Sequence, residues 1–230
     1  MTKQSSVPPF TRRALVLTGG FALAGCALPD LKNIVGPPPP LQIYVLKPQT
    51  AAPAAPIPEV KWQLGIAVPE TTAGLNTPRI AVNPTPTTMD YFTNAAWPDR
   101  APLLMQWLMV QAFENTRRVS VGRETTGLAA DYILQTELRE FQAHYDTPLP
   151  PPPANPDDPP TKREPPTVMI QIEAKLMSVV DRRIIGNFNA TTRATAAENS
   201  VEASVQAFNA AVGQALGQIV DWTMRTPPAA

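Results

Sequence analysis

Residues 167–180, TVMIQIEAKLMSVV, alternate between apolar and polar side chains almost without interruption. Because successive side chains of a β-strand point to opposite faces, this pattern predicts a strand with one buried face and one solvent-facing face. Other elements must cover the apolar face for the chain to fold. The apolar face comprises Val168, Ile170, Ile172, Ala174, Leu176 and Val180.

Other segments keep a period of two over shorter stretches, and each is predicted to be a strand. They are residues 41–48, 60–70, 78–83, 87–94, 117–122 and 131–145, and after a tight turn at 181–183 Ile184, Phe188 and Ala190 continue the apolar face of 167–180. Residues 78–83 and 87–94 predict a hairpin or a sheet edge. Leu138 and Phe141 lie three positions apart instead of two, which predicts a bulge near Arg139–Glu140.

Two segments change to a helical period. The first, within residues 97–116, has Asp99 as its expected N-cap and Pro102 in its first turn, where proline is tolerated. The second carries apolar side chains at spacings of three and four from Val201 to Trp222, and Pro227 stops it. Strands and helices together predict an α+β fold, with a largely antiparallel sheet and two main helices packed on one face.

The first helix is apolar at nearly every position from Leu103 to Phe113. This stripe is wider than a half-exposed helix needs. Either the sheet covers all of it, or part of it faces a partner. The candidate partner-facing residues are Leu103, Leu104, Trp107 and Leu108.

The single cysteine, Cys26, follows a basic segment (1–13) and a short apolar run (14–24). The run is well short of the ~20 residues that cross a bilayer, and the order of segments is typical of a secretory signal. Residues 23–26, LAGC, match the bacterial lipobox. Residues 1–25 are therefore predicted to be a lipoprotein signal peptide and Cys26 to carry covalent lipid, with a buried core cysteine as the alternative. Adjacent arginines at 12–13 leave the twin-arginine and general export routes both open.

The 29 prolines are unevenly spread, and two clusters stand out, one from Pro29 to Pro58 and one at 147–166. We expect residues 26–40 to hold the lipidated cysteine and a stiff spacer, and residues 41–226 to form a single domain with a proline-rich loop at 147–166. Both clusters could instead be ligands for proline-recognition domains.

The composition argues against nucleic-acid binding and catalysis. Without residues 1–25 the chain has 16 basic and 19 acidic residues, a net charge of −3, and shows no basic cluster. The lone histidine, His144, is expected at the surface, and no metal-binding or nucleophile motif occurs. We therefore expect no enzyme activity and no cofactor or metal apart from the lipid on Cys26.

Several segments together resemble a known family. They are the lipobox, Tyr44-Val45-Leu46-Lys47-Pro48, the start of the first helix (Trp97 to Leu108), ADYILQTELREFQAHY (130–145), LMSVVDRRII (176–185) and VEASVQAFNAA (201–211) running into IVDWT (219–223). Over about residues 41–225 the chain resembles the ABC-type transport auxiliary lipoproteins, whose members include paraquat-inducible lipoprotein C. The loop at 147–166 departs from the family pattern, which leaves the partner surface on that edge open.

The resemblance implies a non-catalytic envelope lipoprotein that works with an ABC permease and ATPase and a mammalian-cell-entry-type protein. Such systems move phospholipids or other hydrophobic molecules between the inner and outer membranes. Cys26 is the only functional residue that the resemblance carries over. Ala27 is not the aspartate that retains many lipoproteins at the inner membrane, so the periplasmic face of the outer membrane is favoured.

The sequence leaves three hypotheses for the function. In the first, the anchored domain docks the periplasmic part of the transporter, and a homo-oligomeric ring would match a tube-shaped partner. In the second, it is a lipid-binding carrier with an apolar cavity between sheet and helices. In the third, it is an envelope scaffold unrelated to transport.

Overall fold

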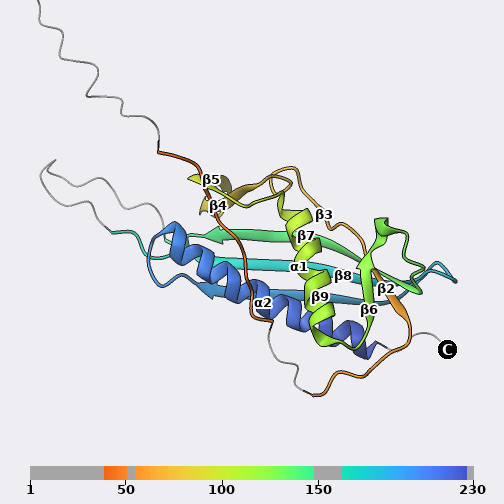
Figure 1. Ribbon diagram of the computed structural model, residues 1–230. Coiled ribbons are helices and arrows are strands. Elements are labelled where there is room, and N and C mark those ends of the chain that lie inside the picture. Colours follow the sequence, from red (N-terminus) through yellow and green to blue (C-terminus); the bar gives the residue numbers. More distant parts are fainter. Residues whose placement is uncertain (1–38, 51–54, 148–161, 227–230) are drawn as a thin grey trace, which may run out of the picture. The chain divides into compact units, whose positions relative to one another are not determined.

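The computed structural model describes residues 39–50, 55–147 and 162–226, which belong to one compact unit. They form a nine-stranded sheet with two α-helices (Figure 1). The predicted signal peptide, residues 26–38 of the predicted spacer, loop residues 148–161 and Pro227 lie outside the described residues. The strands are β1 (Gln42–Ile43), β2 (Gln63–Ile66), β3 (Glu70–Thr71), β4 (Arg79–Thr85), β5 (Thr88–Ala96), β6 (Ser120–Arg123), β7 (Tyr132–His144), β8 (Thr167–Ser178) and β9 (Arg183–Thr195); the helices are α1 (Ala101–Thr116) and α2 (Val201–Arg225).

The long strand β7 organises the sheet. On one side it pairs with β8, which pairs in turn with β9, and both ladders are antiparallel. On its other side the short strands β2, β3 and β4 follow one another, each parallel to β7. Strand β6 lies beside β2, while β5 and then β1 lie beside β4. Parallel neighbours need a long crossover connection, and the segment containing α1 supplies it between β4 and β7.

The α+β class is confirmed, and both helices lie on the same face of the sheet (Figure 1). The antiparallel ladders β7–β8 and β8–β9 are the longest, with twelve residue pairs each, and β4 pairs antiparallel with β5, while the five parallel pairings involve only two to four residue pairs each. The sheet is therefore mixed. The antiparallel pairing of β4 with β5 confirms a hairpin at this point of the chain.

Strand β8 buries the side chains that its alternation predicts, with one exception. The apolar residues from Val168 to Leu176 are almost completely buried against the helices. Val180, however, is 86% exposed, because the strand ends at Ser178 and a turn follows. Ile184 is also exposed, since the ladder shifts register where Leu176 opposes Gly186 and Met177 opposes Ile184. The prediction is wrong for Val180 and Ile184.

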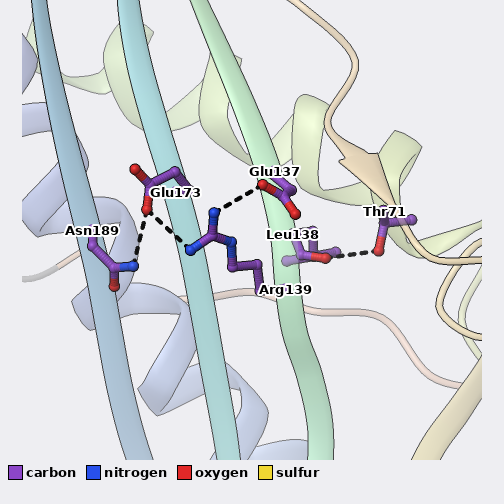
Figure 2. Close-up of polar contacts among 6 residues, drawn as sticks. All are labelled: Thr71, Glu137, Leu138, Arg139, Glu173 and Asn189. Carbon is purple, nitrogen blue, oxygen red and sulfur yellow. Dashed lines mark hydrogen bonds and ion pairs between the residues drawn. The ribbon is translucent and has the colours of Figure 1, made fainter.

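The predicted bulge in β7 is confirmed. Leu138 pairs with Ile172 and Glu140 pairs with Gln171, so Arg139 has no partner in the ladder. This extra residue restores the alternation, and both Leu138 and Phe141 are buried. At the same point Thr71 Oγ1 donates a hydrogen bond of 2.7 Å to the carbonyl oxygen of Leu138 (Figure 2).

The two helices begin differently. Helix α1 follows Arg100, which provides no side-chain cap, and Pro102 lies in its first turn. Asp99 instead accepts a hydrogen bond from the backbone N–H of Arg100, so the prediction that Asp99 caps the helix is wrong. Helix α2 is capped by Ser200, whose Oγ accepts a hydrogen bond from the N–H of Ala203 at 3.1 Å.

An aromatic cluster ties α2 to the sheet. The ring of Phe208 on α2 lies 5.2 Å from Phe141 on β7 and 5.2 Å from Trp97, which follows β5. Trp97 and Phe141 are 5.9 Å apart, and all three side chains are almost completely buried. The cluster belongs to one continuous apolar core that fills the space between sheet and helices.

Candidate functional site

Residues 41–50, here called the arm, cross the first half of helix α2. Tyr44 Oη donates a hydrogen bond of 2.6 Å to Glu202 near the start of α2. Two turns further along, the backbone N–H of Lys47 donates to Asn209 Oδ1 at 2.7 Å. Figure 1 shows this segment lying across α2 on the side away from the sheet. The arm is therefore attached to the helix by polar contacts at successive positions.

Packing holds the arm at two further points. Leu46 is 1% exposed and belongs to the main apolar core. Beyond it, the backbone of Gln49 crosses α2 at Gly213, where a Cβ atom would overlap the carbonyl oxygen of Gln49. Only glycine permits this approach. The motif Tyr44-Val45-Leu46 thus combines a hydrogen bond to α2 with a side chain in the core.

The Tyr44–Glu202 hydrogen bond shifts the titration of both groups. The bond to the carboxylate, with burial second, raises the pKa of Tyr44 from 10.0 to about 12. The same bond lowers the pKa of Glu202 below its ordinary value. Because the pKa of Tyr44 is higher in the folded than in the unfolded chain, the protonated phenol stabilises the fold below pH ~10. This stabilisation is lost as the pH rises through the folded pKa of Tyr44. Because the pKa of Glu202 is lower in the folded than in the unfolded chain, its carboxylate stabilises the fold above the usual carboxyl titration range. This stabilisation is lost as the pH falls through the folded pKa of Glu202.

We expect Tyr44→Phe to raise the pKa of Glu202 back toward the ordinary glutamate value, because the phenol no longer stabilises the carboxylate. An NMR pH titration of the Glu202 side-chain carboxyl carbon measures this pKa directly. Tyr91→Phe is the matched control, since Tyr91 donates to Gly74 and not to α2. An unchanged Glu202 pKa in Tyr44→Phe would show that the phenol does not contact the carboxylate in solution.

The outward side of the arm is apolar. Leu41, Ile43 and Val45 are each at least half exposed, whereas Tyr44 and Leu46 face the protein. Val45 also lines a groove of ≈ 750 Å³ between the arm and the two helices. We call Leu41, Ile43 and Val45 the arm stripe. Three aliphatic side chains in a row, next to a groove, form the kind of surface that binds partners.

The groove has a mixed lining. Apolar surface comes from Val45 and Ile57 on the arm side, Trp107 on α1 and Val220 on α2, together with the amide side chains of Gln111 and Asn115. Among the described residues the charged groups that line it are Lys47 and Arg118, both basic. Arg118 is paired with Glu59 at 3.5 Å, which leaves Lys47 as the basic group without such a partner among the described residues. Such a groove can bind an extended apolar or acidic segment.

The four candidate partner-facing residues of α1 differ in their solvent exposure. Leu104 and Leu108 are buried in the core, so they are not available to a partner and the prediction is corrected for these two. Leu103 is half-buried. Trp107 is 41% exposed and lines the groove. The sheet thus covers one side of the stripe, and Trp107 lies on the other.

The face of the sheet away from the helices is polar. Figure 2 shows Arg139 between Glu137 at 3.1 Å and Glu173 at 3.4 Å, while Asn189 donates to Glu173 at 3.1 Å. These contacts connect β7, β8 and β9. The side chains of Glu137 and Arg139 are each nearly half exposed, so solvent screens these ion pairs and they contribute little to stability. This surface is a solvated face of the sheet.

His144 lies partly buried at the end of β7, with Nε2 3.5 Å from Glu140 Oε2. Within residues 39–50, 55–147 and 162–226 no group of three or more histidine, cysteine, aspartate or glutamate side chains could hold a metal ion. In the same part of the chain, no helix is both long and apolar enough to cross a membrane. Cys26, the predicted lipidation site, lies outside the described residues.

Sequence reasoning missed the residues that hold the arm. Asn209 and Gly213 lie in the interior of a helix, where both residue types are unfavourable. That local cost is the signal that could have found them. It does not reveal the partner, because the arm lies more than 150 residues away in the sequence.

Comparison with known proteins identifies the family. The model of the family described as ABC-type transport auxiliary lipoprotein component matches residues 44–220, from the arm to the last turns of α2. The crystal structure of protein XCC0632 from Xanthomonas campestris is similar, with 26% identity, a TM-score of 0.68, and coverage of 80% of this chain and 96% of that chain. An uncharacterized protein of known structure shares the fold, with 11% identity, a TM-score of 0.56, and coverage of 77% of this chain and 99% of its own. No curated protein matches the chain. Because the family model covers more than half of its length, this chain belongs to the ABC-type transport auxiliary lipoprotein components.

Proposed function

We propose that this protein is a non-catalytic docking component of an ABC-type transport system. Lipid on Cys26 holds it at the periplasmic face of the outer membrane, and its folded domain binds the periplasmic mammalian-cell-entry-type protein of the transporter. The transported molecule is a phospholipid or another hydrophobic compound. Family membership supports the transport role, and the arm stripe with its adjacent groove is the observation that carries the docking role.

The attachment of the arm explains how an anchored domain could hold a partner in place. Residues 27–38 separate Cys26 from the first described residue, Pro39. The arm that follows is fixed to α2 at Glu202, Asn209 and Gly213. A force on the lipid-bearing end is therefore transmitted through the arm to the helix pair, and the arm does not act as a loosely attached terminus.

The carrier hypothesis has less support. It places an apolar cavity between the sheet and the helices, but the described side chains there form one buried core. Phe113 on α1 and Phe208 on α2 have no exposed surface. The groove lies on the other side of the helices, beside the arm, and suits the docking of a partner segment.

The test is crosslinking in cells of the tagged protein, followed by mass spectrometry of the proteins that co-purify. We expect a mammalian-cell-entry-type protein and its permease with the wild type, less of both with the unanchored Cys26→Ala chain, and about tenfold less with Trp107→Asp, since a charge in an apolar contact is costly to bury. Met89→Asp is the matched control, because Met89 is similarly exposed and does not line the groove.

The outcomes distinguish an error in the proposed docking function from an error in the proposed docking surface. If no transporter protein co-purifies with the wild type, the docking function is wrong. If the transporter proteins co-purify equally with wild type and Trp107→Asp, docking stands but uses another surface. A similar loss with Met89→Asp would also exclude the groove, since it would show that any added surface charge weakens binding.

A further inference from the structure

The hairpin between β8 and β9 exposes apolar side chains at its tip. We call residues 179–184, VVDRRI, the β8–β9 tip, and all six are exposed. Val180 has more accessible surface than any other large apolar residue of the described chain, and Val179 and Ile184 flank it. Val180 in particular, at 86% exposed, has almost no packing role within the domain.

Charge at the β8–β9 tip is positive. Arg182 and Arg183 form no ion pair with any residue in the described ranges. The one acid, Asp181, is held within the turn by a hydrogen bond of 3.1 Å from Ser178 Oγ. Arg182 adopts a left-handed backbone conformation with φ 54°, which disfavours non-glycine residues. An arginine at this position thus brings a local conformational cost with no compensating contact in the domain.

Aromatic residues lie at the base of the β8–β9 tip. Tyr132 pairs with Ser178 in the β7–β8 ladder, and Trp62 packs edge-on against Tyr132 at 5.3 Å. Both side chains are half-buried. The N–H of Val179 donates to the carbonyl oxygen of Asp131 at 2.9 Å, which fixes the tip to the end of β7. The tip is therefore presented on a rigid base.

We propose that the β8–β9 tip binds the surface of an anionic phospholipid bilayer. Val179, Val180 and Ile184 enter the outer part of the acyl region, and the two guanidinium groups bind lipid phosphates. Amphipathic aromatic residues such as Trp62 and Tyr132 suit the headgroup level just above. The lipid proposed on Cys26 keeps the domain beside a bilayer, so lipid is the nearest surface that offers both an apolar layer and anionic groups. The pair of unpaired arginines beside them favours the lipid.

The position of the β8–β9 tip relative to the arm indicates what the membrane contact would do. The tip adjoins the N-terminal end of β7, whereas the arm enters the sheet near the C-terminal end of β7, through β1, β5 and β4. The 13 residues of β7 span roughly 44 Å, and the 13 Cα steps from Cys26 to Pro39 span at most roughly 47 Å. This length lets the tip and the lipid on Cys26, on which the proposed function rests, contact the same membrane.

The test uses the mature chain from residue 26 onward, without the predicted signal peptide, with Cys26→Ser, which cannot be acylated, and Val180→Cys labelled with an environment-sensitive fluorophore. On addition of phosphatidylethanolamine–phosphatidylglycerol vesicles we expect the fluorescence to rise about twofold or more as the label leaves water. Replacing Arg182 and Arg183 with serine should weaken the apparent vesicle affinity about thirtyfold. Added salt should weaken it as well. The matched control carries the label at Met89→Cys, an exposed site on β5.

Three results would overturn the proposal. The first is an unchanged signal at position 180 with vesicles. The second is an equal rise at position 89, which would indicate unspecific adsorption. The third is a rise at position 180 that follows protein concentration without lipid, which would assign the tip to a second copy of the chain. Because no lipid is attached to residue 26 in this experiment, its outcome does not depend on the transporter or on the anchor.

Discussion

Replacement of Phe208 by alanine is expected to lower the free energy of unfolding by about 3–5 kcal/mol. Phe208 has no exposed surface and contacts both Trp97 and Phe141. Its loss removes apolar burial, leaves a cavity where α2 meets the sheet and breaks two aromatic contacts, each of which contributes ~1 kcal/mol. Denaturant unfolding followed by circular dichroism measures the change at constant m-value.

Val180→Ala is the control for this experiment. It also removes an aliphatic group, but at a site that is almost fully exposed, so a change within about 0.5 kcal/mol is expected. A loss below ~1 kcal/mol for Phe208→Ala would contradict the close packing of α2 on β7.

Much of the fold could be predicted because it depends on local periodicity. The alternation from Val168 to Leu176 follows directly from the burial of one face of β8. The extra position between Leu138 and Phe141 locates the bulge, since a bulge is the one local feature that restores the alternation. Both helices follow from their period, and Ser200 confirms that α2 begins with a typical polar cap.

Non-local features could not be predicted in the same way. Periodicity shows that Val180 continues the apolar pattern of β8. It does not show that the strand ends at Ser178 and that the turn begins before Val180. A pattern of alternation gives no strand partner, so the parallel placement of β2, β3 and β4 along β7 was not foreseen. For the candidate site, Trp107 and Leu108 look equivalent in sequence, and only the packing of α1 on the sheet distinguishes the exposed residue from the buried one.

The arm shows the same limit most clearly. Residues 41–48 were predicted to be a strand, and they do contain β1, yet most of the segment is held by a helix and not by a neighbouring strand. The attachment depends on three positions of α2 whose contact partners the sequence does not reveal. Glu202, Asn209 and Gly213 acquire their role only when the two ends of the domain meet in space.

Gly213→Ala should release the arm from α2. In an isolated helix this change stabilises by ~1 kcal/mol, because alanine is the better helix former. Here the new methyl group would overlap the carbonyl oxygen of Gln49, which is backbone and cannot move aside alone. Displacing the arm exposes Leu46 and breaks its hydrogen bonds to α2. The expected net loss is about 2–4 kcal/mol of unfolding free energy, and chymotrypsin should cut after Tyr44 or Leu46 about tenfold faster.

Gln214→Ala is the matched control, because it places the same residue in the same turn of α2 at an exposed position. Its cleavage rate should equal that of the wild type, and its stability should rise or stay constant. If Gly213→Ala behaves in the same way, the arm does not cross α2 at this glycine in solution. If the arm is released while the rest of the domain stays folded, the end that carries the proposed lipid loses its connection to the helix pair. Transporter co-purification should then fall, although Trp107 and the groove-facing surface of α1 are unchanged.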